Sequence, residues 1–228
     1  MQTLAVTEER RRPATRRPSH KAAAVELAGR DPVLAALIEA AGPPVFRPPS
    51  DTAFAALTRS VLYQQLAGAA AAAIHGRLIA AMGDPDDPAA LLGLSDDDLR
   101  AVGLSRNKTE SLRDLATKVL DGTVDLDPRH LARADDEDIV AHLSMVRGIG
   151  RWTAQMFLMF QLRRIDVWPV GDFGVRRGYG LAWRVPAPTE RELEPLGDAF
   201  RPYRSVAAWY CWRACELLAG AADSELTR

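Results

Sequence analysis

The sequence has few cysteines and no long apolar segment. Two cysteines, Cys211 and Cys215, occur in 228 residues. They lie four positions apart in a helical pattern, where a disulfide is geometrically unfavourable, and they are too few for a four-cysteine zinc or iron–sulfur centre. No apolar run reaches the roughly 18 to 20 residues that cross a bilayer, and the N-terminus lacks the apolar stretch of a secretory signal. We therefore expect a soluble, intracellular protein with no membrane segment.

Net charge is also nearly absent. The chain has 29 Lys+Arg against 30 Asp+Glu, a formal charge of -1, which by itself argues against a polyanionic partner. The charges are unevenly distributed, however: residues 8–21 are basic, residues 84–98 and 135–138 are acidic, and arginines dominate residues 147–184. One face of the folded chain can therefore be basic, and we expect the acidic clusters to face elsewhere.

The sequence gives little indication of β-strands, because valine and isoleucine are scattered and alternating apolar–polar runs are short. Apolar residues spaced by three and four predict an all-α fold of roughly nine or ten helices in a bundle, with a basic disordered arm over residues 1–21 and a helical domain over 22–228. At this length, one large domain and two small lobes around a cleft are both open. A helix over 50–67 is predicted to start at Ser50 or Asp51, and the last helix at Pro202. Three further helices are predicted to start at Ser95, Ser105 and Thr189.

Residues 137–160 carry the most specific pattern. Two amphipathic segments flank the turn Val146-Arg147-Gly148-Ile149-Gly150, which is short enough only for a tight hairpin. Two glycines one residue apart permit backbone geometries closed to other residues. The second helix should begin near Gly150 with unpaired N–H groups, which can bind a phosphate oxygen of a nucleic-acid backbone without reading bases. Taken alone, the two glycines could equally mark a tight corner.

The longer string through Thr153-Ala154 resembles the helix-hairpin-helix of base-excision DNA glycosylases, whose loop reads L-P-G-I-G-x-x-T-A. Arg147 stands in place of the usual proline, which removes some rigidity. The resemblance implies that the hairpin contacts DNA and that main-chain carbonyls in it hold a monovalent cation, Na⁺ or K⁺, with no other cofactor required. The implied DNA contacts are Arg147, Gly148, Gly150, Arg151 and Thr153, and the implied carbonyls are those of Ser144, Val146 and Ile149.

Catalytic members of this superfamily follow the hairpin with a Gly/Pro-rich loop and an aspartate, and residues 166–177 resemble that segment. Its Asp172 comes after Pro169 and Gly171, at the start of a predicted helix. An N-cap role alone would explain an aspartate there. Position after the hairpin implies catalysis instead: the carboxylate can stabilise a cationic sugar and orient a water. We interpret Asp166, which lies further from the helix start, as structural.

Two further features, the residue at position 152 and the number of cysteines, indicate which branch of the superfamily the chain resembles. Bifunctional members place a nucleophilic lysine two residues after the second glycine, where this chain has Trp152, so the resemblance implies a monofunctional enzyme. Iron–sulfur branches need four cysteines. What remains resembles the alkylated-base branch, of the 3-methyladenine DNA glycosylase II type, over about residues 50–218. It implies a base pocket of Trp152, Trp212 and Tyr203, whose aromatic faces attract a cationic purine; helix core is the alternative for both tryptophans.

A base buried in duplex DNA must be turned out of the stack, and the resemblance places the residue that fills the gap at Gln65 or Leu66. An ordinary helix end would also suit both side chains. The implied partner is double-stranded DNA with alkylated bases, acted on by a monomer associated with the nucleoid in a bacterial cytoplasm. Two alternatives stay open: a non-catalytic helix-hairpin-helix DNA-binding module, and a glycosylase for deaminated or etheno bases.

Overall fold

A computed structural model describes residues 18–66 and 68–225 of the chain. Over these residues all regular secondary structure is helical, with thirteen α-helices, one π-helix, one 3-10 helix and no strand. The predicted all-α class is confirmed, although short helices of six or seven residues raise their number above the predicted nine or ten. The predicted basic arm lies outside the described residues up to position 17. For its last residues the prediction of disorder is wrong, because the first helix begins at His20, where the Ser19 hydroxyl accepts the Ala22 N–H.

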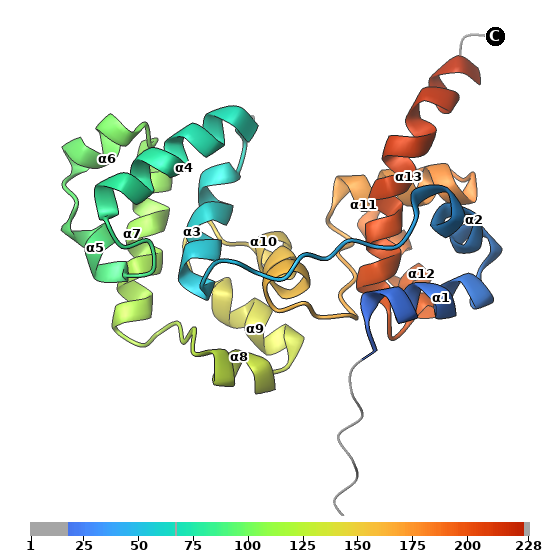
Figure 1. Ribbon diagram of the computed structural model, residues 1–228, viewed down its shortest axis with the longest axis horizontal. Helices are drawn as coiled ribbons and strands as arrows, with labels where there is room; N and C mark the ends of the chain where they lie inside the picture. The colour runs from blue at the N-terminus through green and yellow to red at the C-terminus, as the bar shows by residue number, and fades with distance from the viewer. Residues whose placement is uncertain (1–17, 67, 226–228) are drawn as a thin grey trace, which may run out of the picture.

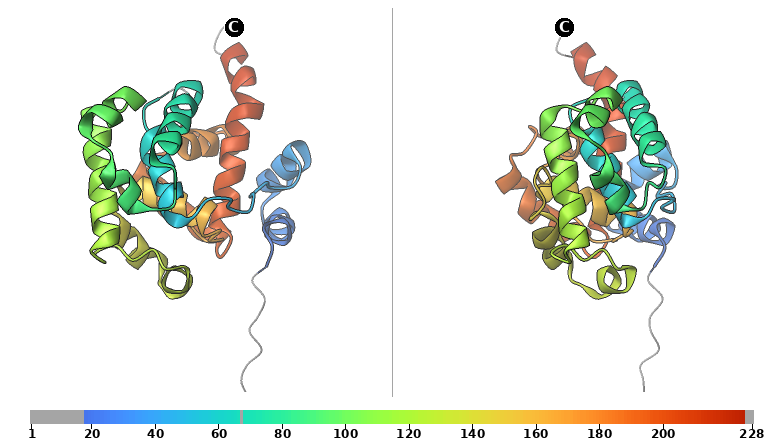
Figure 2. Two further views of the ribbon diagram at one scale, coloured as in Figure 1. Left: turned by 60° about the vertical axis from the view of Figure 1, so that its left-hand side comes forward. Right: turned by 90° about the vertical axis from the view of Figure 1, so that its left-hand side faces the viewer.

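The helices form two lobes (Figures 1 and 2). The hairpin lobe contains α3 (Ala53–Tyr63), α4 (Gly68–Met82), α5 (Pro88–Gly93), α6 (Asp96–Val102), α7 (Arg106–Leu120), α8 (Pro128–Arg133), α9 (Asp136–Leu143), α10 (Arg151–Met156) and the π-helix η1 (Phe157–Gln161). The terminal lobe contains α1 (His20–Arg30), α2 (Pro32–Ala41), α11 (Phe173–Trp183), α12 (Glu190–Leu196), the 3-10 helix η2 (Gly197–Phe200) and α13 (Arg204–Glu225). Irregular segments over 42–52 and 162–172 join the lobes.

Several helix starts follow the predicted caps. Ser95 and Thr189 form capping boxes, and the Ser105 hydroxyl accepts the N–H of Lys108 at the start of α7. The predicted helix over 50–67 is wrong at both ends. It begins after Thr52, whose hydroxyl accepts the Ala55 N–H, and it ends at Tyr63, shortly before a residue with φ +56°.

The last helix begins at Arg204, so the prediction that Pro202 opens it is wrong. The reason lies in the loop between the lobes. The Arg204 N–H donates to the Asp166 carboxylate, and the Ser205 N–H donates to the Ile165 carbonyl. These bonds tie the first turn of α13 to the segment 162–172.

The two helices α11 and α13 cross in close contact within the terminal lobe. A Cβ on Gly178 would lie 1.8 Å from the Cys211 carbonyl oxygen, so only glycine allows this approach. The crossing brings the start of α11, where Asp172 lies, beside Trp212 of α13. Among the described residues, no helix is both long and apolar enough to span a bilayer.

Candidate active site

The carboxylate of Asp172 accepts hydrogen bonds from residues of three helices, α10, α11 and α13. It is the N-cap of α11 and is 9% exposed. Its Oδ1 accepts the Val175 N–H at 2.8 Å and the indole Nε1–H of Trp212 at 2.8 Å. Its Oδ2 accepts the indole Nε1–H of Trp152, on α10, at 2.7 Å. The capping bond occupies one oxygen only, so an N-cap role does not account for the whole carboxylate.

A carboxylate has about four lone-pair positions for hydrogen bonds. Two donors approach Oδ1 of Asp172 and one approaches Oδ2, which leaves a position on Oδ2. The site can therefore orient a nucleophilic water while its other bonds keep the carboxylate fixed.

The contact between Asp172 and Trp212 requires glycine at position 174. A Cβ on Gly174 would lie 2.8 Å from Trp212 Cδ1 and 3.1 Å from Asp172 Oδ1. Both distances are shorter than ordinary van der Waals contact. Gly174 therefore lets the ring and the carboxylate pack against the first turn of α11.

Aromatic rings extend away from Asp172. Trp152 is 46% exposed, and Phe160 is 42% exposed. Phe160 stacks on Trp212 with ring centroids 5.9 Å apart and also on Phe46, at the same distance. Phe46 in turn stacks on His20, with centroids 4.0 Å apart. The row offers flat apolar faces beside the carboxylate, which suit a planar heteroaromatic ring.

The hairpin lies between α9 and α10 and contains a type II turn. The Ile149 N–H donates to the Val146 carbonyl at 3.0 Å, Gly148 has φ +78°, and Arg147 is not among the residues with positive φ. This combination defines type II, whose third residue favours glycine. A Cβ on Gly148 would also lie 2.5 Å from Ser111 Oγ.

Gly150 is the N-cap of α10, as the sequence predicts, and no described side chain caps it. The first N–H groups of α10 therefore lack partners within the helix and point outward from its start. Such a terminus attracts an anion, and next to a tight turn it can be approached by a phosphate.

A match to a family model covers residues 58–201 and bears the description "HhH-GPD superfamily base excision DNA repair protein". The chain belongs to this superfamily. The DNA-3-methyladenine glycosylase 1 of Schizosaccharomyces pombe is 34% identical over 164 residues, which are 71% of this chain and 72% of that protein.

Solved structures agree with the match. A Schizosaccharomyces pombe 3-methyladenine DNA glycosylase in complex with abasic DNA aligns with TM-score 0.74 and 31% identity, over 86% of this chain and 97% of that one. A DNA-3-methyladenine glycosidase from Bacillus halodurans aligns with TM-score 0.78 and 35% identity, over 86% of this chain and 91% of that one.

The three predicted pocket residues of this HhH-GPD protein do not lie together. Trp152 and Trp212 both bond to Asp172. Tyr203 is 6% exposed, its hydroxyl donates to Glu26 at 2.9 Å, and the Arg30 guanidinium lies over its ring. The structure therefore directs Tyr203 toward α1, because the Glu26 carboxylate supplies its hydroxyl with an acceptor there.

Phe160 ends the second amphipathic segment of residues 137–160, where the apolar pattern predicts an ordinary helix face and no place in the site. The π-helix Phe157–Gln161 changes the register of that helix and leaves the ring exposed beside Trp212. A π-turn has no marker in a pattern spaced by three and four, so the sequence offers no signal for this position.

The loop after α3 is linked to the hairpin. The Gln64 side chain donates to the Gly148 carbonyl at 3.0 Å and to the Thr153 hydroxyl at 3.3 Å. Gln65, with φ +56°, and Leu66, 37% exposed, project from this loop. Both are exposed next to the hairpin, and contact of either with DNA stays a prediction, as does which of them enters the base stack.

Both predicted DNA-binding arginines of the hairpin are already paired. Arg147 lies 2.6 Å from a Glu110 carboxylate oxygen, and Arg151 contacts both oxygens of Glu137, at 2.8 and 2.6 Å. The hydrogen bonds from Arg151 to Glu137 raise the pKa of the guanidinium further, although burial opposes this. The expectation that the acidic cluster 135–138 faces away from the hairpin is wrong for Glu137, because its carboxylate pairs with Arg151 at the start of α10.

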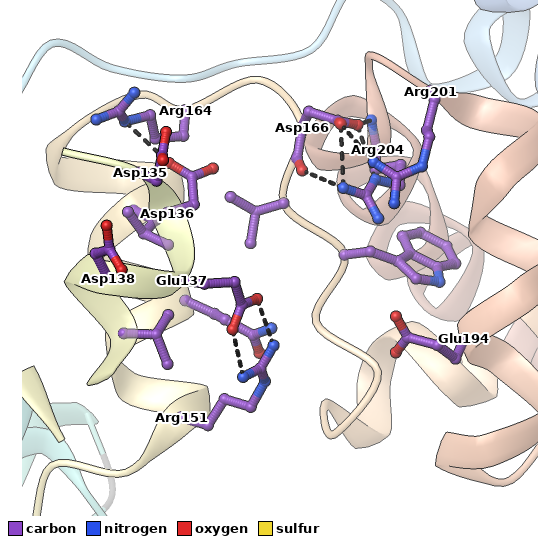
Figure 3. A pocket seen from close by; sticks show the side chains of 15 residues that line it. Asp135, Asp136, Glu137, Asp138, Arg151, Arg164, Asp166, Glu194, Arg201 and Arg204 are labelled. Carbon is purple, nitrogen blue, oxygen red and sulfur yellow. Dashed lines mark hydrogen bonds and ion pairs between the residues drawn. The ribbon is translucent and has the colours of Figure 1, made fainter. Parts of the chain in front are cut away.

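Arg151 and Glu137 also line a cavity of about 680 Å³ between the lobes (Figure 3). Across this cavity, Asp166 pairs with Arg204 at 2.8 Å and with Arg201 at 3.1 Å. These ion pairs hold the segment 162–172 to the start of α13. They agree with the structural role that the sequence suggested for Asp166.

The carbonyls of Ser144, Val146 and Ile149, implied to hold Na⁺ or K⁺, belong to the hairpin turn. The Val146 carbonyl accepts one N–H, from Ile149, so its second lone pair remains for a cation. Neutral oxygen ligands fit a hard monovalent ion, and the cation stays a prediction. Among the described residues, no cluster of His, Cys, Asp or Glu could hold a metal, and both cysteines are free.

Proposed function

We propose that this chain is a monofunctional DNA glycosylase that excises alkylated purines, such as 3-methyladenine and 7-methylguanine, from duplex DNA and leaves an abasic site. The observation that carries this is one carboxylate, Asp172, fixed by the indole N–H groups of Trp152 and Trp212 beside exposed aromatic rings. The relatives named for 3-methyladenine support the same substrate class.

An N3- or N7-alkylated purine is cationic and already a good leaving group. The rings of Trp152, Phe160 and Trp212 can attract it by cation–π interaction, with about 0.5 to 2 kcal/mol for each favourable face. No strong general acid is then needed to protonate the base. Selectivity over normal purines follows in part from charge, since a neutral purine gains less from the same rings.

Asp172 acts on the sugar. As the N-glycosidic bond breaks, the bonding electrons leave with the base, which becomes neutral, and positive charge develops at C1′. The carboxylate stabilises that charge, and its Oδ2 can hold the attacking water and take up its proton as the C1′–O bond forms. The indole and backbone donors keep the carboxylate in place throughout.

The lysines of the chain support hydrolysis without strand cleavage. The sequence contains three, Lys21, Lys108 and Lys118. Lys21 lies on α1, the Lys108 ammonium donates to the Leu62 and Gln64 carbonyls, and the Lys118 ammonium is engaged by Asp114. Trp152 occupies the position of the Schiff-base lysine, so the chain lacks the amine with which bifunctional members attack C1′.

The DNA backbone would be held at the hairpin by the N–H groups at the start of α10. Asp172 and the two indole groups that bond to it come from one chain, which is consistent with the monomeric enzyme proposed.

Chromatography of the bases released from randomly methylated DNA tests this function and reveals the lesion spectrum. We expect 3-methyladenine and 7-methylguanine among the products, and much slower release of the lesion by the same preparation from separate duplexes that carry one etheno or deaminated base. Release of the neutral lesions alone would favour the etheno or deaminated-base glycosylase. Binding with no release of any base would favour the non-catalytic DNA-binding module.

A further inference from the structure

Arg147 occupies a position that favours proline. It is the second residue of the type II turn Val146–Ile149, where φ lies near −60° and proline is common because its ring already fixes that angle. Arginine there leaves the turn freer in solution and adds a backbone N–H that proline would lack. A restraint on the turn must therefore come from another part of the chain.

Helix α7 supplies the restraint. Asp114 Oδ2 accepts the Arg147 N–H at 2.7 Å, although the two residues lie 33 positions apart. The same oxygen accepts a hydrogen bond from the Lys118 ammonium at 2.7 Å, and that ammonium also donates to the Met145 carbonyl at 2.7 Å. An aspartate and a lysine one helical turn apart thus bind the peptide groups on either side of Val146.

Asp114 and Lys118 are suited to restraining the turn, because their charges are opposite and their side chains are only partly exposed. Partial burial works to raise the pKa of Asp114, but hydrogen bonds from Lys118 and from the Arg147 N–H, with both positive charges, together hold it below its usual range. The carboxylate is therefore ionised at neutral pH and makes charge-assisted hydrogen bonds, which are stronger than neutral ones.

We propose that Asp114 is a positioning residue that holds the hairpin turn in the conformation a proline would impose, with Lys118 fixing the preceding carbonyl. The consequence for excision rests on the proposed function, whereas the effect on the turn does not. Without Asp114, the turn would sample other conformations, and DNA would have to order it on binding. With proline at position 147, the N–H is gone and φ is fixed, so Asp114 becomes dispensable to the turn.

A double-mutant cycle tests this directly, because coupling between the two positions is the prediction. Asp114→Ala is made in three backgrounds: wild type, Arg147→Pro, and Arg147→Met, which loses the charge but keeps the N–H. Affinity for duplex DNA with an abasic-site analogue is measured by fluorescence anisotropy. We expect Asp114→Ala to weaken binding about 5- to 20-fold in the wild-type and Arg147→Met backgrounds, and by less than about twofold in the Arg147→Pro background.

Equal losses in all three backgrounds would overturn the role of Asp114 in the turn. Asp114→Asn is the control for a general effect on folding and for loss of the ion pair with Lys118. It removes the negative charge, but an asparagine oxygen can still accept the Arg147 N–H. We expect Asp114→Asn to bind within about threefold of wild type, since the acceptor remains. A loss as large as that of Asp114→Ala would also overturn it. Thermal unfolding monitored by circular dichroism checks that each variant is folded.

Hydrogen exchange in the free protein tests the role of Asp114 independently of the proposed function. In the free protein, Asp114→Ala should speed exchange of the Ile149 N–H, whose bond closes the turn, and Arg147→Pro should restore its protection in the double variant. If exchange and binding both show the coupling but wild type releases no base, the proposed function is overturned and the role of Asp114 stands. If wild type releases base but the coupling is absent, the role of Asp114 is overturned and the proposed function stands.

Discussion

The indole N–H of Trp212 and the backbone N–H of Val175 donate to the same oxygen of Asp172, each at 2.8 Å. One belongs to α13 and the other to the first turn of α11, so a single carboxylate oxygen joins the two helices. The second oxygen binds Trp152 of the hairpin lobe. Asp172, the two tryptophans of the proposed pocket and the hairpin helix α10 are thus linked by direct hydrogen bonds.

The first prediction concerns Asp172→Asn. The amide oxygen can accept the bonds from Val175 and Trp212, but the NH₂ group then faces the Trp152 N–H, donor against donor. Excision should fall at least about 100-fold, because the negative charge opposite C1′ is lost. Trp152 is half exposed and can bond to water, so we expect a stability change below about 1 kcal/mol. Denaturant unfolding distinguishes the two effects, and large destabilisation would mean that the carboxylate mainly holds the fold.

The second prediction concerns Gly174→Ala. The added Cβ would lie 2.8 Å from Trp212 Cδ1, so the ring must move away from Asp172. We expect a loss of about 1 to 3 kcal/mol in stability from overpacking and a severe loss of excision. Gly171→Ala is the matched control, because its Cβ meets only the Glu190 carboxylate, at 4.0 Å. Equal excision rates for the two variants would argue against a requirement for this contact.

The third prediction separates the two hairpin glycines. Gly148→Ala combines φ +78° with a Cβ 2.5 Å from Ser111 Oγ, so it should lower both stability, by about 1 to 3 kcal/mol, and DNA affinity. A Cβ on Gly150 has no heavy atom within 4 Å, so Gly150→Ala should fold normally. It should still weaken binding to undamaged duplex, because the methyl group stands at the helix start where phosphate approaches. Unchanged binding by folded Gly150→Ala would contradict the phosphate site.

The fourth prediction concerns the carboxylates that pair with the hairpin arginines. If Arg151 contacts phosphate, Glu137 competes for it, and Glu137→Gln should tighten binding to undamaged duplex and steepen its salt dependence by about one unit. Glu110→Gln should act in the same direction through Arg147. Asp97→Asn is a control, because Asp97 pairs with Arg100 on α6, away from the hairpin. Equal changes in all three variants would indicate a general effect of net charge.

The fifth prediction is a pH dependence of stability at Asp114. Its folded pKa lies below its ordinary value of 3.8, so its contribution is present above that value and is lost as the pH falls through the folded pKa. The difference in unfolding free energy between wild type and Asp114→Asn, about 1 kcal/mol or less, should be constant above about pH 5 and shrink below about pH 4. A difference that grows in acid would contradict the depressed pKa.

The sequence predicted the parts of the site that local patterns encode. The hairpin, the N-cap of α10 at Gly150 and the N-cap role of Asp172 each follow from residues close together in the chain. The pairing of Trp152 and Trp212 with one carboxylate agrees with the pocket that the family resemblance implied.

The remaining features depend on contacts between distant segments. Asp114 meets Arg147 across 33 positions, and Tyr203 turns to Glu26 because α1 packs on α13. The pairing of Glu137 with Arg151 reverses the expected separation of acidic and basic faces. Helix periodicity says which side of a helix is apolar, but it does not say which other helix lies against it.

The most direct test of the central claim is one reaction on duplex DNA carrying a single 7-methylguanine, in which released base, abasic sites and strand breaks are all measured. Wild type should release the base and form an equal amount of abasic sites in unbroken strands, and Asp172→Asn should do neither at a comparable rate. Rapid release by Asp172→Asn, or strand cleavage by wild type in step with base release, would contradict hydrolysis directed by Asp172.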